Sequence, residues 1–110
     1  MIKPNRGQVW DITFIDHGEN STLPFLVLSD DLLNNSAAGI VIILPVIYDE
    51  KGIRSHIKAS LTGVEPIQYI YVCCEEIVTV SVDRCHQLVG SITQKNMDEI
   101  SYTVKMLLGL

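Results

Sequence analysis

Residues 40–48, IVIILPVIY, form the most continuous apolar stretch of the chain and decide its fold class. Branched residues such as Ile and Val favour β-strands. The stretch is also far shorter than the roughly 18 apolar residues that a membrane-spanning helix requires. It therefore predicts a buried strand. Pro45 lacks a backbone N–H, so we expect a bulge or an edge position late in this strand.

The residues before this strand predict two more strands and a loop. Residues 8–15, QVWDITFI, alternate polar and apolar side chains, as in a strand with one wet face. Residues 16–23, DHGENSTL, have the composition of a loop. A second buried strand is expected at residues 24–29, where Pro24 fits the first position. Residues 31–34 predict one helical turn.

The residues after it predict short strands followed by one helix. The strands are expected at residues 55–59, 69–74, 78–82 and 85–92. Thr93 is expected to cap the helix, and Gly109 to end it. An apolar stripe follows at helical spacing: Met97, Ile100, Val104, Leu107 and Leu108. The predicted fold class is α+β, a small, mostly antiparallel curled sheet or barrel with a C-terminal α-helix, in one domain spanning residues 1–110.

Charge and cysteine content limit the partners. The chain of 110 residues has a formal charge of −5, which opposes a phosphate backbone. No N-terminal signal or membrane span is visible, and the three cysteines predict a reducing cytoplasm. The grouping of Cys73, Cys74, Cys85 and His86 lacks zinc-knuckle spacing, and neighbouring strand residues point to opposite faces. We therefore expect no metal and no cofactor.

Two histidines and two glutamates are candidates for acid–base chemistry. His17 lies in the predicted loop and could act as a general base, although a solvated loop histidine is the simpler interpretation. His56 could donate a proton or occupy a strand edge. Glu19 and Glu75 are carboxylate candidates, but the sequence does not set their separations. The residues alone indicate a soluble α+β domain without a secure site.

Several short motifs, taken in order, resemble the MazF/PemK (Kid) toxin family. RGQVW at residues 6–10 resembles the family's opening motif, and PFLVLS at residues 24–29 resembles its second strand. EEIVT at residues 75–79 and LLGL at residues 107–110 resemble later family motifs. Further similarities lie at Asn34, Pro45-Val46 and Ser55-His56. No single motif is specific, but the ordered set covers residues 6–110.

The resemblance implies a fold and a function. The family has a compact barrel-like sheet with a C-terminal helix, forms homodimers, and cleaves single-stranded RNA without a metal. Its partner is an antitoxin protein that lays a flexible segment over the dimer, and DNA binding would occur only through that antitoxin. A chain of this family is expected to be a cytoplasmic toxin that inhibits growth.

Three positions depart from the family pattern. Leu23 stands where the family carries an arginine before the proline, Ile47 where it has a threonine at the end of the third strand, and Val78 where it has a later arginine. RNA cleavage needs a base, an acid and positive charge at the phosphate, and none of these side chains supplies them. Losing one preorganised donor can cost about 2.7–4 kcal/mol in the transition state.

Three hypotheses follow. In the first, ribonuclease activity is lost or altered and the groove binds an antitoxin or another protein; this groove would include Trp10, Pro24, Tyr48, Arg54, Thr79 and Arg84. In the second, the chain cleaves RNA with substitute groups, namely His17, His56, Glu19 and Glu75, while Arg54, Lys58 or Arg84 holds phosphate. In the third, it poisons gyrase as in the CcdB group, although the terminal Trp-Gly-Ile is absent. Trp10 is expected to be core more than a stacking platform.

Overall fold

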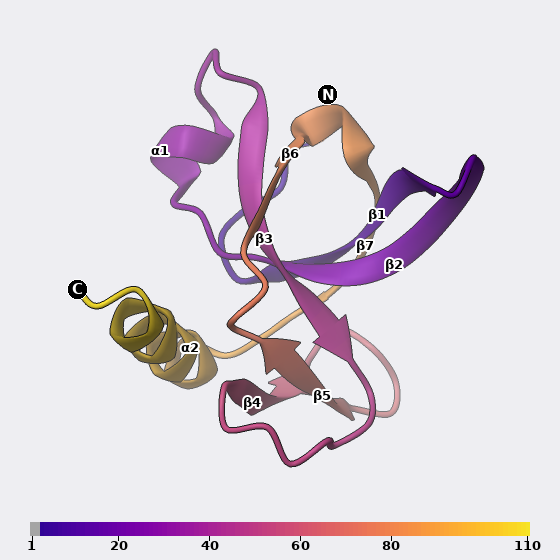
Figure 1. Cartoon of the computed structure of the whole chain (residues 1–110). Helices are drawn as coiled ribbons and strands as arrows, with labels where there is room; N and C mark the ends of the chain where they lie inside the picture. The colour runs from indigo at the N-terminus through magenta and orange to yellow at the C-terminus, as the bar shows by residue number, and fades with distance from the viewer. Residues whose placement is uncertain (1–2) are drawn as a thin grey trace.

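The computed structural model describes residues 3–110, apart from the Asp16 side chain, so the first two residues of the predicted 1–110 domain lie outside it. The described chain forms a curled antiparallel sheet and a C-terminal helix (Figure 1). The elements are β1 (Gln8–Asp16), β2 (Glu19–Val27), α1 (Asp31–Asn34), β3 (Ile40–Ile47), β4 (His56–Leu61), β5 (Gln68–Cys73), β6 (Val78–Ser81), the 3₁₀ turn η1 (Val82–Arg84), β7 (Cys85–Ser91) and α2 (Gln94–Leu107). The predicted fold class is confirmed.

The sheet curls strongly without closing into a barrel. Its strand order is β4-β5-β3-β2-β1-β7, and β6 pairs with β3 outside this path. The two ends of the order approach each other at one bridge, between Thr62 and Ser91. Gly90 lies against this bridge, and a Cβ atom there would be 2.3 Å from the Thr62 carbonyl oxygen. The close approach of the two edges therefore needs a residue without a side chain.

Strand β3 connects the two halves of the sheet, which explains its apolar sequence. One edge of β3 pairs with β2, while the other pairs first with β6, up to Ile43, and then with β5, from Val46. Pro45 lies between these two sets of pairs and opposite Phe25. The expected bulge or edge at Pro45 is instead a change of neighbour within a central strand.

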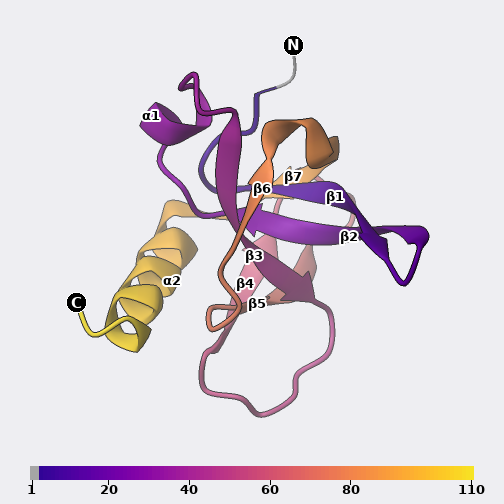
Figure 2. The same ribbon diagram turned by 45° about the horizontal axis from the view of Figure 1, so that its top comes forward.

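The predicted loop at residues 16–23 is wrong. β1 and β2 form a long hairpin whose pairs continue to Asp16 and Glu19, so its turn contains only His17 and Gly18 (Figure 2). Both turn residues have positive φ, at 51° and 81°, as two-residue turns of type I′ require. Pro24 is consequently inside β2, opposite Asp11, and not at its first position.

Two apolar clusters lie on opposite faces of the sheet. The larger contains Leu44, Val46 and Ile70, and α2 covers it with Met97, Ile100 and Val104. The smaller contains Trp10, Ile12, Phe25, Val27, Val41, Ile43 and Cys85. Because side chains alternate along a strand, β3 contributes to both clusters. Helix α2 does not cover the second face, although Val82 of η1 packs against its cluster.

Helix α2 begins and ends as predicted. The Thr93 hydroxyl accepts a hydrogen bond from the Asn96 N–H at 3.2 Å, and Gly109 adopts a positive φ of 74°. Beyond the helix, the N–H groups of Gly109 and Leu110 donate to the carbonyls of Met106 and Lys105, which is a Schellman motif. The predicted apolar stripe is buried only in its first three members. Leu107 and Leu108 are 49% and 56% exposed.

Among residues 3–110, the helices are too short or too polar to cross a bilayer.

Candidate functional site

One face of the sheet carries most of the candidate residues. In β4 and β5, His56 pairs with Cys73 and Lys58 pairs with Tyr71, so these four side chains share a face. Tyr71 also pairs with Ile47 at the end of β3. The face that carries His56 therefore continues along β3 to the smaller apolar cluster. We call this continuous surface the groove face.

Ser55, His56 and Glu75 form a hydrogen-bonded group at one end of the groove face. The Ser55 hydroxyl donates to Glu75 Oε1 at 2.6 Å, and His56 Nε2 lies 2.8 Å from Glu75 Oε2. The His56 side chain is 6% exposed, whereas that of Glu75 is 36% exposed. Both carboxylate oxygens are thus oriented by neighbours, while one side of the group stays open to solvent.

The environment keeps Glu75 ionised. Partial burial acts to raise the pKa of this carboxyl, but hydrogen bonds from Ser55, from its own backbone N–H and from His56 outweigh burial. The pKa of Glu75 is therefore lower than its ordinary 4.5. A carboxylate held in this way can accept a hydrogen bond or bind a cation, and it is a weaker base than a free glutamate.

The three cysteines are free and buried, as the sequence predicted for Cys73 and Cys74. Burial, aided by Glu75 and Glu76, raises the pKa of Cys73 to about 11. Burial also raises the pKa of Cys74 to about 12, with Glu75 and Cys73 adding to the effect, and that of Cys85 to about 11. These thiols are protonated at neutral pH and unreactive as nucleophiles.

A cavity of about 240 Å³ opens beside His56. Tyr71 and Arg54 line it together with the turn that follows β3, from which Lys51 contributes. Lys51 is close enough to lower the pKa of Cys73, against the larger effects that raise it. On the same face the Lys58 ammonium lies 4.6 Å from the centre of the Tyr69 ring. Positive charge is therefore present near the Ser55–His56–Glu75 group.

The three positions that depart from the family pattern lie on the groove face. Leu23 is two residues from Phe25, which faces Pro45, and Ile47 is two residues beyond Pro45 on the same side of β3. Val78 pairs with Ile43 of β3. Ile43 is four residues before Ile47, which corresponds to roughly 13 Å along the strand. Leu23 is 51% exposed and Val78 is 40% exposed. The groove face is thus apolar and accessible where the resemblance predicts arginine and threonine.

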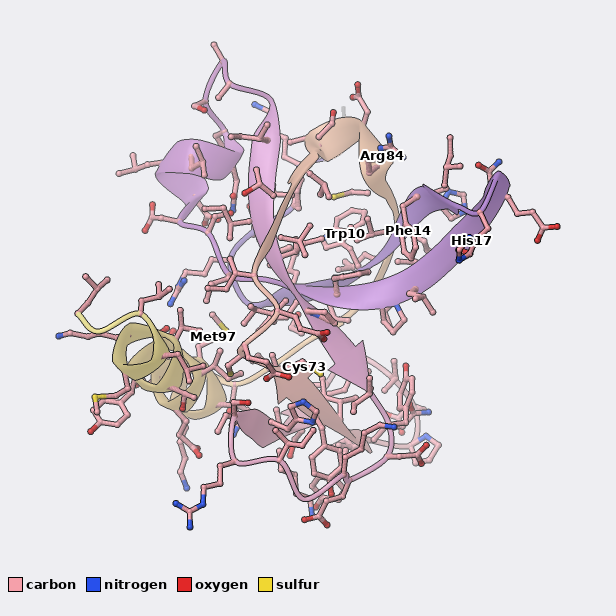
Figure 3. The ribbon with its side chains drawn as sticks, in the orientation of Figure 1. Trp10, Phe14, His17, Cys73, Arg84 and Met97 are labelled. Atoms are coloured by element: carbon pink, nitrogen blue, oxygen red, sulfur yellow. The ribbon has the colours of Figure 1, made fainter. Side chains whose placement is uncertain are left out.

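The predicted groove residues occupy different depths. Trp10 is 5% exposed, and its indole N–H donates to Gln8 Oε1 at 3.0 Å, so the ring lies beneath the surface. Pro24 is half-buried, whereas Tyr48 is 52% exposed. Thr79 and Arg84 line a hollow of about 400 Å³ together with Phe14. Figure 3 labels Arg84 and Phe14. The Arg84 guanidinium also donates to the Thr13 carbonyl at 3.4 Å.

His17 and Glu19 do not join His56 and Glu75. His17 lies at the turn of the projecting β1–β2 hairpin. Cys73, which pairs with His56, lies near the end of β5, away from that turn (Figure 3). A larger hollow of about 600 Å³, lined by Asn35 and Asp83 among others, contains none of the candidate residues. The four acid–base candidates thus fall into two separate places, with His56 in contact with Glu75 at one of them.

Sequence reasoning missed three contributors to this site. Ser55 binds Glu75, although the sequence showed it only as part of a motif. Lys51 and Tyr71 line the cavity. For Tyr71 the available signal was the period of two along β4 and β5, which places it on the face of His56 once the register is known. Ser55 and Lys51 lie outside these strands, so this pattern could not indicate them.

The fold is similar to solved toxin structures. The chain aligns with a MazE–MazF complex from Deinococcus radiodurans at a TM-score of 0.81 and 19% identity, covering 100% of this chain and 99% of that chain. It aligns with an endoribonuclease in complex with its cognate antitoxin from Mycobacterial species at a TM-score of 0.75 and 24% identity, covering 97% and 96%. A search of curated protein sequences found no match.

The family whose pattern fits this sequence is described as PemK-like, MazF-like toxin of type II toxin-antitoxin system, and it matches residues 5–108. That range contains every strand, both helices and the whole groove face. The chain belongs to this family of type II toxins.

Proposed function

We propose that this toxin binds an antitoxin segment along its groove face, and that its RNA-cleaving activity is weakened or lost. The observation that carries the proposal is the shared face of Leu23, Ile47 and Val78. Side chains of this kind bury well against a protein segment but give no charge to a phosphate. Two similar structures, one from Deinococcus radiodurans and one from Mycobacterial species, contain a toxin with its antitoxin.

The overall charge supports the same proposal. A formal charge of −5 makes the approach of an RNA backbone unfavourable unless cations gather at the groove. Lys51, Arg54 and Lys58 lie at one end of the groove face, and Arg84 lines the hollow beside Phe14, where its guanidinium donates to the Thr13 carbonyl. The stretch between Leu23 and Val78 therefore suits an apolar peptide better than a polyanion.

The proposal is tested by restoring the charge that the family resemblance predicts. A triple variant, Leu23→Arg with Ile47→Thr and Val78→Arg, is compared with the wild type for binding and cleavage of a broad pool of single-stranded RNA. Each arginine that meets a phosphate should steepen the slope of log affinity against log salt by about 0.7. Leu32→Arg is the matched control, since Leu32 is 86% exposed in α1 and lies off the groove face.

We expect the wild type to leave the RNA intact, and the triple variant, but not Leu32→Arg, to bind it more tightly. The product of the neighbouring reading frame, co-expressed with the chain, should co-purify with it, and Leu23→Asp should weaken that complex. Efficient RNA cleavage by the wild type would overturn the loss of activity.

A second candidate function is endoribonuclease activity through the Ser55–His56–Glu75 group. It is favoured by one observation, the hydrogen-bonded carboxylate next to Lys51 and Arg54. Glu75 would take the proton of the 2′-hydroxyl as this oxygen attacks the adjacent phosphate. His56 would protonate the 5′-oxygen as its bond to phosphorus breaks, and Arg54 would neutralise the phosphate. Under this hypothesis RNA is cleaved by the wild type, and cleavage falls about 100-fold or more in Glu75→Gln. His17→Ala, at the hairpin turn, should leave it unchanged.

We also propose that the toxin is a homodimer. The outer side of α2 exposes Tyr102 and Met106, at 65% and 59%, and Leu110 beyond the helix is 77% exposed. Contiguous exposed apolar surface is a feature of protein–protein interfaces. Light scattering of the purified chain should give twice the monomer mass of 12.3 kDa. Met106→Glu should return it to the monomer mass.

A further inference from the structure

We propose that His56, Cys73 and Glu75 bind a zinc-class divalent ion, an interaction that goes beyond the proposed function. The three residues converge because His56 of β4 pairs directly with Cys73 of β5, and Glu75 follows two residues later in the turn. Their ligand atoms, one from each side chain, all lie within 4.8 Å of one another. One face of one strand pair therefore supplies a nitrogen, a sulfur and an oxygen to a common point.

The donor set identifies the kind of ion. Imidazole, thiolate and carboxylate are the ligands that Zn²⁺ uses in proteins, whereas Mg²⁺ and Ca²⁺ take oxygen ligands. A tetrahedral zinc ion with bonds of about 2.0–2.3 Å needs donor atoms about 3.3–3.8 Å apart. The ligand atoms, which lie up to 4.8 Å apart, would have to approach one another by about 1 Å to reach this spacing. Three protein ligands leave the fourth position for water or an external group.

The hydrogen bonds of His56 support the site. Its side chain is 6% exposed and Nε2 meets Glu75, but Nδ1 is buried and has no hydrogen-bond partner among the described residues. A buried polar atom without a partner costs free energy, and such an atom calls for an explanation. An ion bound through Nδ1 would give that atom a partner, whereas an ion bound through Nε2 would replace the hydrogen bond with Glu75. Since Glu75 is 36% exposed, the ion can enter from solvent.

The groups around the cluster carry both signs. Glu75 and Glu76 are acidic, while Glu50, Lys51 and Arg54 line the neighbouring cavity beside His56. The ion binds the thiolate, so the Cys73 proton leaves to solvent as the metal–sulfur bond forms. Bound through Nε2, the ion would also take Glu75 and His56 away from the hydrogen bond that the second candidate function requires.

The test uses the full chain, stripped of metal by a chelator and then titrated with Co²⁺. Cobalt bound to a thiolate gives an intense near-ultraviolet charge-transfer band, and tetrahedral cobalt gives visible bands. We expect both to saturate at one ion per chain and to disappear when Zn²⁺ is added. Cys73→Ser should abolish the charge-transfer band, and Glu75→Gln and His56→Gln should weaken affinity about tenfold or more.

Matched controls separate this site from adventitious binding. Cys85→Ser removes another buried thiol, and Glu76→Gln removes the neighbouring exposed glutamate; both should keep the band and the affinity. If Cys73→Ser does not fold, His56→Gln decides in its place. The proposal is overturned if no charge-transfer band forms, or if the band survives in the ligand variants. Neither RNA nor antitoxin enters this titration, so its failure leaves the proposed function untouched.

Discussion

His56 Nε2 and Glu75 Oε2 lie 2.8 Å apart, although 19 residues separate them in the chain. The pairing of His56 with Cys73 sets this distance, because it fixes β4 against β5 immediately before the turn that carries Glu75. The contact joins two groups that the sequence presented separately. It is also the part of the groove face where charge, and not apolar surface, dominates.

Glu75→Gln should lower the free energy of unfolding at neutral pH. It should also remove the part of the acid-induced loss of stability that comes from protonation of Glu75. The lowered pKa means that the folded state holds the Glu75 carboxylate ionised at pH values where the unfolded chain, near 4.5, becomes protonated. The wild type therefore gains stability above pH 4.5 and loses it as the pH falls through the folded value. Because Glu75 is exposed, we expect less than about 1 kcal/mol.

Urea unfolding between pH 3 and 7, in buffer with a chelator, measures this difference. The two curves of stability against pH should converge at the acid end. If the curves of the wild type and Glu75→Gln stayed parallel over the whole pH range, the lowered pKa of Glu75 would be contradicted. Glu76→Gln serves as the control and should follow the wild type.

Gly90→Ala should destabilise the fold by about 1–3 kcal/mol or more, through overpacking. The added Cβ would meet the Thr62 carbonyl oxygen at 2.3 Å and the Leu61 side chain at 2.9 Å, so the two sheet edges would have to separate. Gln87→Ala, on an exposed position of the same strand, should stay within about 0.5 kcal/mol of the wild type. Chemical denaturation provides the comparison, and equal midpoints for the two variants would refute the role given to Gly90.

The cysteines should resist a thiol reagent such as Ellman's in the folded protein. Burial holds the pKa values of Cys73 and Cys85 at about 11, and that of Cys74 at about 12, so thiolate is scarce at pH 8. We expect no rapid reaction in native buffer and three equivalents after unfolding in guanidinium. Because the pKa values of Cys73 and Cys85 are raised from 9.0 to about 11, the protonated thiols stabilise the fold fully below pH 9. This stabilisation is lost as the pH rises through 11. One rapidly labelled thiol in native buffer would show that its burial is wrong.

Asn34→Ala should cost about 1–3 kcal/mol, because it leaves buried hydrogen-bonding groups without partners. The Asn34 side chain is 3% exposed and donates to the Ser29 carbonyl at 3.0 Å and to Asp31 Oδ1 at 3.1 Å, while it accepts from the Ser29 hydroxyl. The neighbouring Asn35 is exposed, so Asn35→Ala is the matched control. Thermal unfolding of both variants makes the test, and a wild-type melting temperature for Asn34→Ala would contradict it.

Local patterns predicted the elements whose partners lie close in sequence or whose burial is complete. The continuous apolar run of β3 and the stripe of Met97, Ile100 and Val104 indicated their structures directly. The β1–β2 hairpin was missed because His17 and Gly18 form a turn within a polar segment whose composition resembles a loop. The site was predicted only in fragments. His56 and Glu75 were candidates, but their contact depends on the β4–β5 register, which no local pattern encodes.

The alternation of β3 between two clusters separates the helix-covered core from the groove face, where we propose that the antitoxin binds. Leu44 and Val46 pack under the helix, while Ile43 and Ile47 turn to the other face. Replacements at Leu23, Ile47 or Val78 can therefore accumulate over generations with little penalty to the helix-covered core. A scaffold with this property can be inherited intact while its chemistry drifts, so kinship within the family is a better guide to shape than to catalysis.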